Sequence, residues 1–336
     1  MKKVLLASTA LVAFAGAATA DVAITGSAEM GIYDNGNVDN ATATSASGSG
    51  PQLFQDVDVT FTMSGETDGG VAFGASVDLD EAGGIAGSAE DDQGFAVFVS
   101  GGFGTVTLGN TDGALDWAMT EVTGPGTIAD NETAHQGFRG SYLDGSYDGQ
   151  IIRYEYSFGD FAFAVSAETT DGDVAVAAVA PSAPVTTDGT GYAVGLRYAI
   201  DLGSNSIDVG VGHQSIDVAG TAGDGDATGV SLSGTFGGLT AGVVYTKTDF
   251  TGASALDGNH VWVGASYTAG AFTVGANYGK FSSDLAGGAE PDGYAVTANY
   301  DLGGGAIIQA GFNSGNTGVA GAADVDTWSL GLRMNF

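Results

Sequence analysis

The chain has 336 residues, among them 40 acidic and eight basic side chains, which give a formal net charge of −32. A protein this acidic repels phosphate, which excludes electrostatic binding of nucleic acid. The absence of cysteine excludes disulfide frameworks, thiolate nucleophiles and cysteine-ligated metal sites. Hydrophobic residues make up 43% of the chain and aromatic residues 10%, more than an acidic disordered protein would carry.

Residues 1–20 have the features of a secretory signal peptide. Lys2 and Lys3 precede an apolar stretch, and small residues ending at Ala20 offer a cleavage site. The apolar stretch is too short to cross a membrane as a helix. The mature chain is expected to form one domain over residues 21–336. Its net charge would be about −34, from 40 acidic and six basic residues.

Short segments with strict alternation follow the predicted signal peptide. In the first clear case, Val57, Val59 and Phe61 alternate with Asp56 and Asp58. A period of two with one apolar and one polar face is typical of strands wetted on one side only. Glycine is frequent and proline rare, with 58 Gly against five Pro, and each glycine costs a helix up to about 1 kcal/mol. The same alternation recurs at 71–79, 152–158, 192–198 and 294–300.

Tight and long connections between these segments alternate along the chain. Tight ones include Gly101-Gly102, Gly159-Asp160 and Gly237-Gly238, whereas the long, polar ones cover 35–52, 81–93, 111–148, 170–189, 217–227 and 315–323. This pattern predicts sixteen strands, with an uncertainty of about two. They should begin near Asp21, Leu53, Gly70, Gly94, Phe103, Gly149, Asp160, Gly191, Ser206, Ala227, Leu239, Asn259, Ala271, Gly293, Gly305 and Asp324.

An even number of antiparallel strands with tight turns at one end and long loops at the other predicts an all-β, transmembrane antiparallel β-barrel. A soluble sandwich would need more bulky aliphatic residues than these Ala- and Gly-filled strands provide. Lipid cannot satisfy free backbone groups, so the sheet must close on itself. The final run, DTWSLGLRMNF, alternates strictly and is expected to pair with the first strand. Phe336 would end its lipid-facing row at the periplasmic interface.

Four features resemble general porins of the bacterial outer membrane, especially those of alphaproteobacteria such as purple non-sulfur bacteria. They are DVAITGSAEMGIYD after the signal peptide, GGFGTVTLGNTDGALD before the long third loop, IIRYEYSFGDFAFAVSAE after it, and the terminal Phe336. The resemblance covers the mature chain. It implies a sixteen-stranded barrel, usually a homotrimer, whose third loop folds into the lumen and narrows a water-filled diffusion channel.

The third loop and two following strands hold the candidates for the pore constriction. In the resembled family, acids on this loop face bases on the barrel wall and set a field across the narrowest point. Acids outnumber bases here, which predicts a weak cation preference; ordinary solvated loop charges are the alternative. The constriction candidates are Asp112, Asp116, Glu121, Asp130, Glu132, Arg139, Arg153 and Arg197.

Acidic clusters in the loops could bind calcium through oxygen ligands. No twelve-residue calcium-loop pattern supports them, and solvated loop faces are the alternative. Passive diffusion requires no cofactor, so calcium is only a possible ligand. The calcium candidates are Asp78, Asp80, Glu81, Asp91 and Asp92.

Catalysis has little support in the sequence. Phosphate-loop and zinc-protease motifs are absent. The three histidines, His135, His213 and His260, are far apart in sequence, and the last two fall near strand ends where an exposed structural role is expected.

Two lysines mark an expected lipid interface. Lys247 and Lys280 each follow a tyrosine by two residues on the outward face, Tyr245 and Tyr278. This places them just above the apolar band, at the height of lipid phosphates. The expected partners are outer-membrane lipid and lipopolysaccharide, with generic snorkelling as the alternative.

The sequence as a whole predicts an outer-membrane porin for passive diffusion of small hydrophilic solutes and ions. An acidic calcium-binding surface or structural β protein, or an adhesin, is the alternative. A barrel enzyme is a third possibility that the sparse histidines disfavour.

Overall fold

The computed structural model describes most of the chain after residue 20. The described residues are 21–34, 36, 50–80, 94–128, 132–133, 135–140, 142–143, 151–169, 174–176, 185–187, 190–217, 224–252 and 257–336. Residues 1–20 lie outside them, so the signal peptide stays a prediction.

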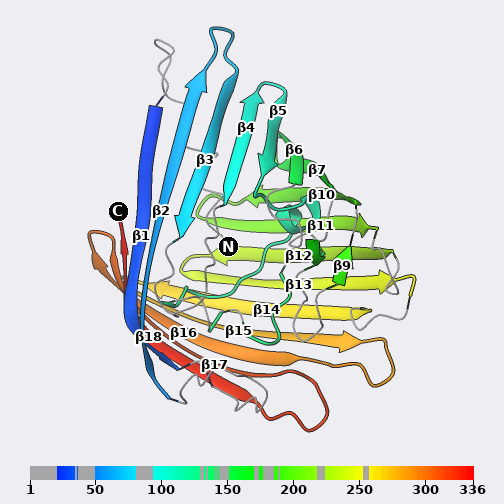
Figure 1. Cartoon of the computed structure of the whole chain (residues 1–336). Helices are drawn as coiled ribbons and strands as arrows, with labels where there is room; N and C mark the ends of the chain where they lie inside the picture. The colour runs from blue at the N-terminus through cyan, green and yellow to red at the C-terminus, as the bar shows by residue number, and fades with distance from the viewer. Residues whose placement is uncertain are drawn as a thin grey trace.

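Sixteen antiparallel strands close into one barrel (Figure 1). Neighbours in the barrel follow chain order throughout, except that β7 pairs with β10. The barrel strands are β1 (Asp21–Asp34), β2 (Gln52–Glu66), β3 (Ala72–Asp80), β4 (Phe95–Gly101), β5 (Gly104–Gly109), β6 (Ile151–Phe158), β7 (Phe161–Thr169), β10 (Thr190–Asp201), β11 (Asn205–Ile216), β12 (Gly225–Phe236), β13 (Leu239–Phe250), β14 (Gly258–Ala269), β15 (Phe272–Ser283), β16 (Asp292–Gly303), β17 (Ala306–Asn316) and β18 (Val325–Asn335).

The predicted barrel and its strand count are confirmed, and each strand begins within two residues of its predicted position. Turn chemistry explains this agreement. Gly159, Gly237 and Gly270 each end a strand with φ of 61°, a left-handed conformation that favours glycine. The segment predicted as the loop 170–189 differs, because β8 (Val174–Val176) and β9 (Val185–Thr187) pair as a small separate hairpin.

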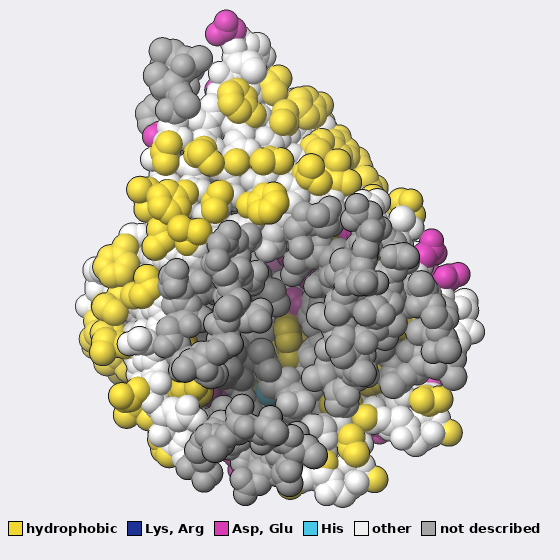
Figure 2. All heavy atoms as spheres, in the orientation of Figure 1, with side chains coloured by type: hydrophobic (Ala, Val, Ile, Leu, Met, Phe, Trp, Pro, Cys, Tyr) yellow, Lys and Arg dark blue, Asp and Glu magenta, His cyan; other side chains and the backbone are white. Residues whose placement is uncertain are grey.

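The outer face carries the apolar side chains of the alternating pattern. On β10, Tyr192, Val194 and Leu196 are 59%, 54% and 54% exposed, whereas Ala193 between them is buried. Bands of hydrophobic side chains cross the upper part of Figure 2 in the same way. Such a continuous apolar surface would be a liability in water and fits a lipid-facing barrel wall. Within the described part of the chain, no helix has the length and apolar character to span a membrane.

The hydrophobic core lies inside the barrel. It joins the helix α1 (Ala114–Ala118) and residues that follow it to the inner faces of β7 and β10–β14. Leu115 and Trp262 are completely buried in this contact. The core therefore depends on the segment after β5 and not on two packed sheets.

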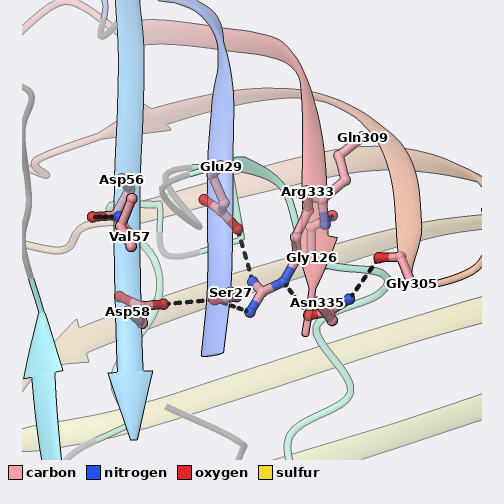
Figure 3. A network of polar contacts seen from close by, with 10 residues as sticks. All are labelled: Ser27, Glu29, Asp56, Val57, Asp58, Gly126, Gly305, Gln309, Arg333 and Asn335. Atoms are coloured by element: carbon pink, nitrogen blue, oxygen red, sulfur yellow. Dashed lines mark hydrogen bonds and ion pairs between the residues drawn. The ribbon is translucent and has the colours of Figure 1, made fainter. Parts of the chain in front are cut away.

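The barrel closes where β18 pairs with β1, as the alternation of the final run predicts. The inner face of this seam holds an ion-pair network (Figure 3). Arg333 on β18 donates to Glu29 Oε1 at 2.8 Å and to Ser27 Oγ at 3.0 Å, both on β1. Ser27 in turn donates to Asp58 on β2 at 2.8 Å. One guanidinium thus links three strands across the closure.

Replacing Arg333 with Met should destabilise the barrel, because Glu29 is only 6% exposed and would lose the guanidinium with which its carboxylate is paired. Removing one partner of a buried ion pair costs about 3–5 kcal/mol. The measurement is the free energy of unfolding in urea with lipid vesicles. The control is the R333M/E29Q double variant, which should recover part of the loss. An R333M barrel as stable as the parent would contradict this role for the seam.

Candidate functional site

The described residues between β5 and β6 lie against the inner wall of the barrel. We call the described residues between 110 and 143 the inner segment, with residues 110–128 as its outward arm and residues 132–133, 135–140 and 142–143 as its return arm. Four hydrogen bonds to strands β7, β14, β15 and β17 of the wall trace its outward arm. Ser166 on β7 accepts from Ala114 N at 2.8 Å, Trp262 Nε1 on β14 donates to Val122 O at 3.1 Å, Asn277 Nδ2 on β15 donates to Thr123 O at 2.6 Å, and Gln309 Nε2 on β17 donates to Gly126 O at 3.1 Å.

Inward-facing glycines make room for this close approach. The carbonyl oxygen of Val122 lies where a Cβ of Gly264 would be, and that of Ala118 lies where a Cβ of Gly210 would be. Any side chain at these two positions would push the backbone of the inner segment off the wall. The high glycine content thus serves a specific contact on the polar face of the strands.

The return arm of the inner segment packs against the same wall. Glu132 Oε2 accepts from Ser329 Oγ on β18 at 2.6 Å, and His135 Nε2 lies 2.8 Å from Asn277 Oδ1 on β15. Tyr142 donates its hydroxyl to Glu121 and so joins the return arm to the outward arm. The segment is held at both arms and cross-linked between them.

Two of the predicted constriction bases, Arg153 on β6 and Arg197 on β10, hold the start of the inner segment. Arg153 Nη1 donates to the backbone carbonyl of Asp112 at 2.6 Å, and its Nη2 pairs with Glu155 at 3.2 Å. The guanidinium of Arg197 lies 4.4 Å from the ring centroid of Trp117 in α1. Both arginines face inward as predicted, but each is engaged in packing.

The predicted constriction acids fall into different environments. Asp112 and Asp116 are half-buried, and Glu121 is buried with its bond from Tyr142. Glu132 is completely buried, so it does not present its carboxylate to water inside the barrel as predicted, because the return arm packs it against β17 and β18. Asp130 lies outside the described residues.

Arg139, the last constriction candidate, stacks over Phe281 of β15 with 5.0 Å between its guanidinium carbon and the ring centroid. Burial lowers the pKa of Arg139 to about 10, which leaves it charged at neutral pH. Its charge therefore stays next to the wall on the β15 side of the barrel.

A group of carboxylates lines the inner faces of β1–β3, and of these only Asp78 was singled out from the sequence, as a calcium candidate. Glu29 on β1 stands opposite Asp56 on β2, and Asp58 stands opposite Asp80 of β3 in the strand register. Asp78 is exposed on the same face and accepts from Thr60 at 2.9 Å. We call Glu29, Asp56, Asp58 and Asp78 the acidic wall. The alternation of β2 placed Asp56 and Asp58 on the polar face, but only the barrel turns that face into a lumen.

The acidic wall also corrects part of the calcium prediction. Asp78 and Asp80 belong to strand β3 and not to a loop, because β3 continues to Asp80. Glu81, Asp91 and Asp92 lie outside the described residues. Among the described residues, no three His, Asp or Glu side chains are grouped as a metal site. Calcium binding by the loop stays a prediction.

Two of the three histidines come together, contrary to their scattered positions in sequence. His135 stacks on Trp262 with 5.2 Å between ring centroids, and His260 lies on the same wall with its Nε2 2.9 Å from Gly137 O. His260 is 2% exposed, so the expected exposed role is wrong for it, since the return arm covers its strand end. His213 is exposed as expected, 3.5 Å from Asp226. Only the long-range packing of the return arm reveals this pairing.

The predicted lipid-interface residues lie on the outer face. Lys247 pairs with Asp249 at 2.5 Å and Lys280 with Glu290 at 3.6 Å, and the two lysine side chains are 46% and 43% exposed. They flank β14 on neighbouring strands. Phe336 is 79% exposed, and its backbone pairs with that of Gly26.

Comparison with solved structures shows the same fold. A triple mutant of the Rhodopseudomonas blastica porin matches with a TM-score of 0.63 and 20% identity, covering 94% of this chain and 100% of that one. A double mutant of the same porin matches with a TM-score of 0.63 and 19% identity, with the same coverage. At this identity the match concerns the fold alone.

Sequence comparisons add the family. A porin from Rhodobacter capsulatus is 30% identical over 207 residues, which are 60% of this chain and 58% of that protein. The match therefore spans less than two thirds of the relative's length. The family model for Gram-negative porins matches residues 7–320, nearly the whole chain. The chain belongs to the Gram-negative porin family.

Proposed function

We propose that this protein is a water-filled channel for passive diffusion of small hydrophilic solutes and ions across the bacterial outer membrane. The observation that carries the proposal is a closed barrel with an apolar outer face and charged groups on its inner face. Rings of charged side chains govern passage through such pores. Diffusion of this kind needs neither catalytic residues nor a cofactor.

A weak cation preference follows from the distribution of inner charges. The acidic wall includes an exposed carboxylate, Asp78, and half-buried ones, Asp56 and Asp58. The inner arginines are engaged elsewhere: Arg153 in an ion pair with Glu155, and Arg197 against Trp117. Carboxylates therefore dominate the charge that a permeating ion meets near β1–β3, and they raise the local cation concentration.

Replacing Asp56, Asp58 and Asp78 together with Asn should shift the zero-current potential in a salt gradient toward anions. Three unit charges about 10 Å from the ion, screened over one Debye length, contribute about 0.4–0.5 kcal/mol, or about twofold in the permeability ratio. Asn can still accept the bonds from Ser27 and Thr60, so the fold should persist.

Two further variants locate the effect. Asp226→Asn with Asp249→Asn, on the outer face of β12 and β13, is the control and should leave the zero-current potential unchanged. Asp112→Asn with Asp116→Asn tests the inner segment separately. An unchanged potential in the triple wall variant would remove the acidic wall from the permeation path.

We further propose a homotrimer in which β4 and β5 face a second copy. β5 has six residues and β4 seven, whereas β10–β16 have twelve each. A tilted strand needs about 9–11 residues to cross the hydrocarbon layer. The outer side chains here are nevertheless apolar, among them Phe95, Val97 and Val99. These strands are too short to span the hydrocarbon layer, so we expect a second copy of the protein to cover their apolar outer side chains.

Replacing Val99 with Arg should therefore dissociate the trimer in mild detergent, seen as a monomer by native mass spectrometry. The matched variant Val263→Arg, on the longer strand β14, should stay trimeric while losing about 2–4 kcal/mol of stability in the bilayer. A parent protein that is monomeric in mild detergent would overturn the proposed assembly.

The outer lysines support association with phosphorylated outer-leaflet lipid such as lipopolysaccharide. Lys247 and Lys280 sit one step beyond Tyr245 and Tyr278 on the outward rows, where tyrosines mark the interface. A surface lysine contributes about 1 kcal/mol of attraction to an anionic membrane. Replacing both with Gln should lower the lipid phosphate that copurifies with the barrel severalfold. Unchanged phosphate would leave snorkelling as their role.

A further inference from the structure

His135 sits at the point where the return arm meets the wall. It is 5% exposed and stacks on Trp262, which is completely buried. Three residues further on, Phe138 contacts the same indole edge-on, with 5.0 Å between ring centroids. The backbone carbonyls of Gly137 and Gly279 each occupy the place where the other residue's Cβ would be. The arm thus lies in close contact with β14 and β15 around Gly137.

Hydrogen bonding around His135 fixes its protonation. The backbone N–H of Gly137 donates to His135 Nδ1 at 3.1 Å, so Nδ1 carries no proton. Asn277 donates its Nδ2 to Thr123 O at 2.6 Å, which turns its Oδ1 toward His135. Nε2 of His135 must then carry the proton and donate to Asn277. The ring is neutral. Asn277 links the two arms of the inner segment, because it binds Thr123 of the outward arm and His135 of the return arm.

A second proton on His135 would have no acceptor in this arrangement, because Nδ1 already receives the Gly137 N–H. Its titratable and charged neighbours are Glu132 and Arg139 on the inner segment, His260 on β14 and Asp292 on β16. Burial lowers the pKa of His135 below its ordinary value, although the hydrogen bond to Asn277 and the charge of Asp292 both favour the charged ring. His260 donates to Gly137 O, and its Nδ1 is buried without a hydrogen-bond partner among the described residues.

We propose that His135 and Asn277 are positioning residues of the channel, and that they hold the return arm on the wall only while His135 is neutral. Protonation breaks the bond from Gly137 and releases the arm into the lumen, where it interrupts the ion path. The inference rests on the proposed channel function and adds a pH-dependent control to it.

The direction of the pH dependence follows from linkage. The return arm contacts the wall only when the His135 ring is neutral. This docking of the arm on the wall is therefore fully stabilised above the ordinary histidine pKa of about 6.5. It weakens as the pH falls from there toward the lower pKa of the docked state. For each pH unit of acidification between the two pKa values, the equilibrium constant for docking of the arm falls about tenfold.

Single-channel recording in planar bilayers between pH 8 and pH 4 tests the proposal. The parent protein should show steady openings above about pH 6.5 and more frequent closures below it. His135→Gln keeps a donor for Asn277 and cannot be charged, so its closures should not increase on acidification. His213→Gln is the matched control, an exposed histidine on β11, and should behave as the parent does.

Gly279→Ala provides the complementary variant, because a methyl group there displaces the arm at any pH. It should close frequently even at pH 8. An acid-induced increase in closures that survives in His135→Gln would overturn the proposal, as would a parent channel insensitive to pH. A reconstituted protein with no conductance at any pH would instead contradict the proposed channel function.

Nuclear magnetic resonance of 15N-histidine-labelled protein in detergent micelles gives an independent measurement should His135→Gln fail to fold. With three histidines in the chain, the single variants His213→Gln and His260→Gln assign the signals. The expected His135 signal is the neutral Nε2–H form at pH 7, with a pKa below 6.5. A charged ring or the Nδ1–H form at pH 7 would contradict the geometry on which the proposal depends.

Discussion

Every other feature of this protein depends on one constraint, that lipid offers no hydrogen-bond partner to the backbone. The sheet therefore has to close, and β18 has to pair with β1 although the two lie at opposite ends of the chain. Closure gives each strand a lipid face and a lumen face with a strict period of two. A shift by one residue would exchange the faces, so the register is fixed by the same requirement.

Closure also decides where the protein can build a core. The outer face must stay apolar for lipid, so additional packing can form only inside, and the inner segment supplies it. The wall accommodates this segment through inward glycines such as Gly210 and Gly264, and it binds the segment through side chains such as Trp262 and Asn277. The lumen is thus partly filled with ordinary protein interior, and a buried group such as Glu132 inside the barrel is a packing residue.

The features that the sequence predicted are those encoded locally. Alternation and turn glycines located all sixteen strands and their outward faces, because each depends on neighbouring residues alone. Contacts between distant residues carried no such signal. Arg333 reaches Glu29 across 304 positions, and His135 meets Asn277 across 142. Asp78 was grouped with the acidic cluster of the following loop although the alternation at 71–79 includes it, and only the strand register shows the acidic wall.

The scarcity of bases links these observations. All four arginines of the chain make interior contacts: Arg333 spans the seam, Arg153 holds Asp112 just before α1, Arg197 stacks on Trp117 of α1, and Arg139 packs the return arm on Phe281. Each is used for structure, because a guanidinium can satisfy backbone carbonyls and stack on rings at the same time. These contacts hold the arginines in place, so few basic side chains can move toward the carboxylates on β1–β3. The overall acidity of the sequence thus becomes a local property of the channel wall, where Arg333 compensates Glu29 and the other three arginines make their contacts elsewhere.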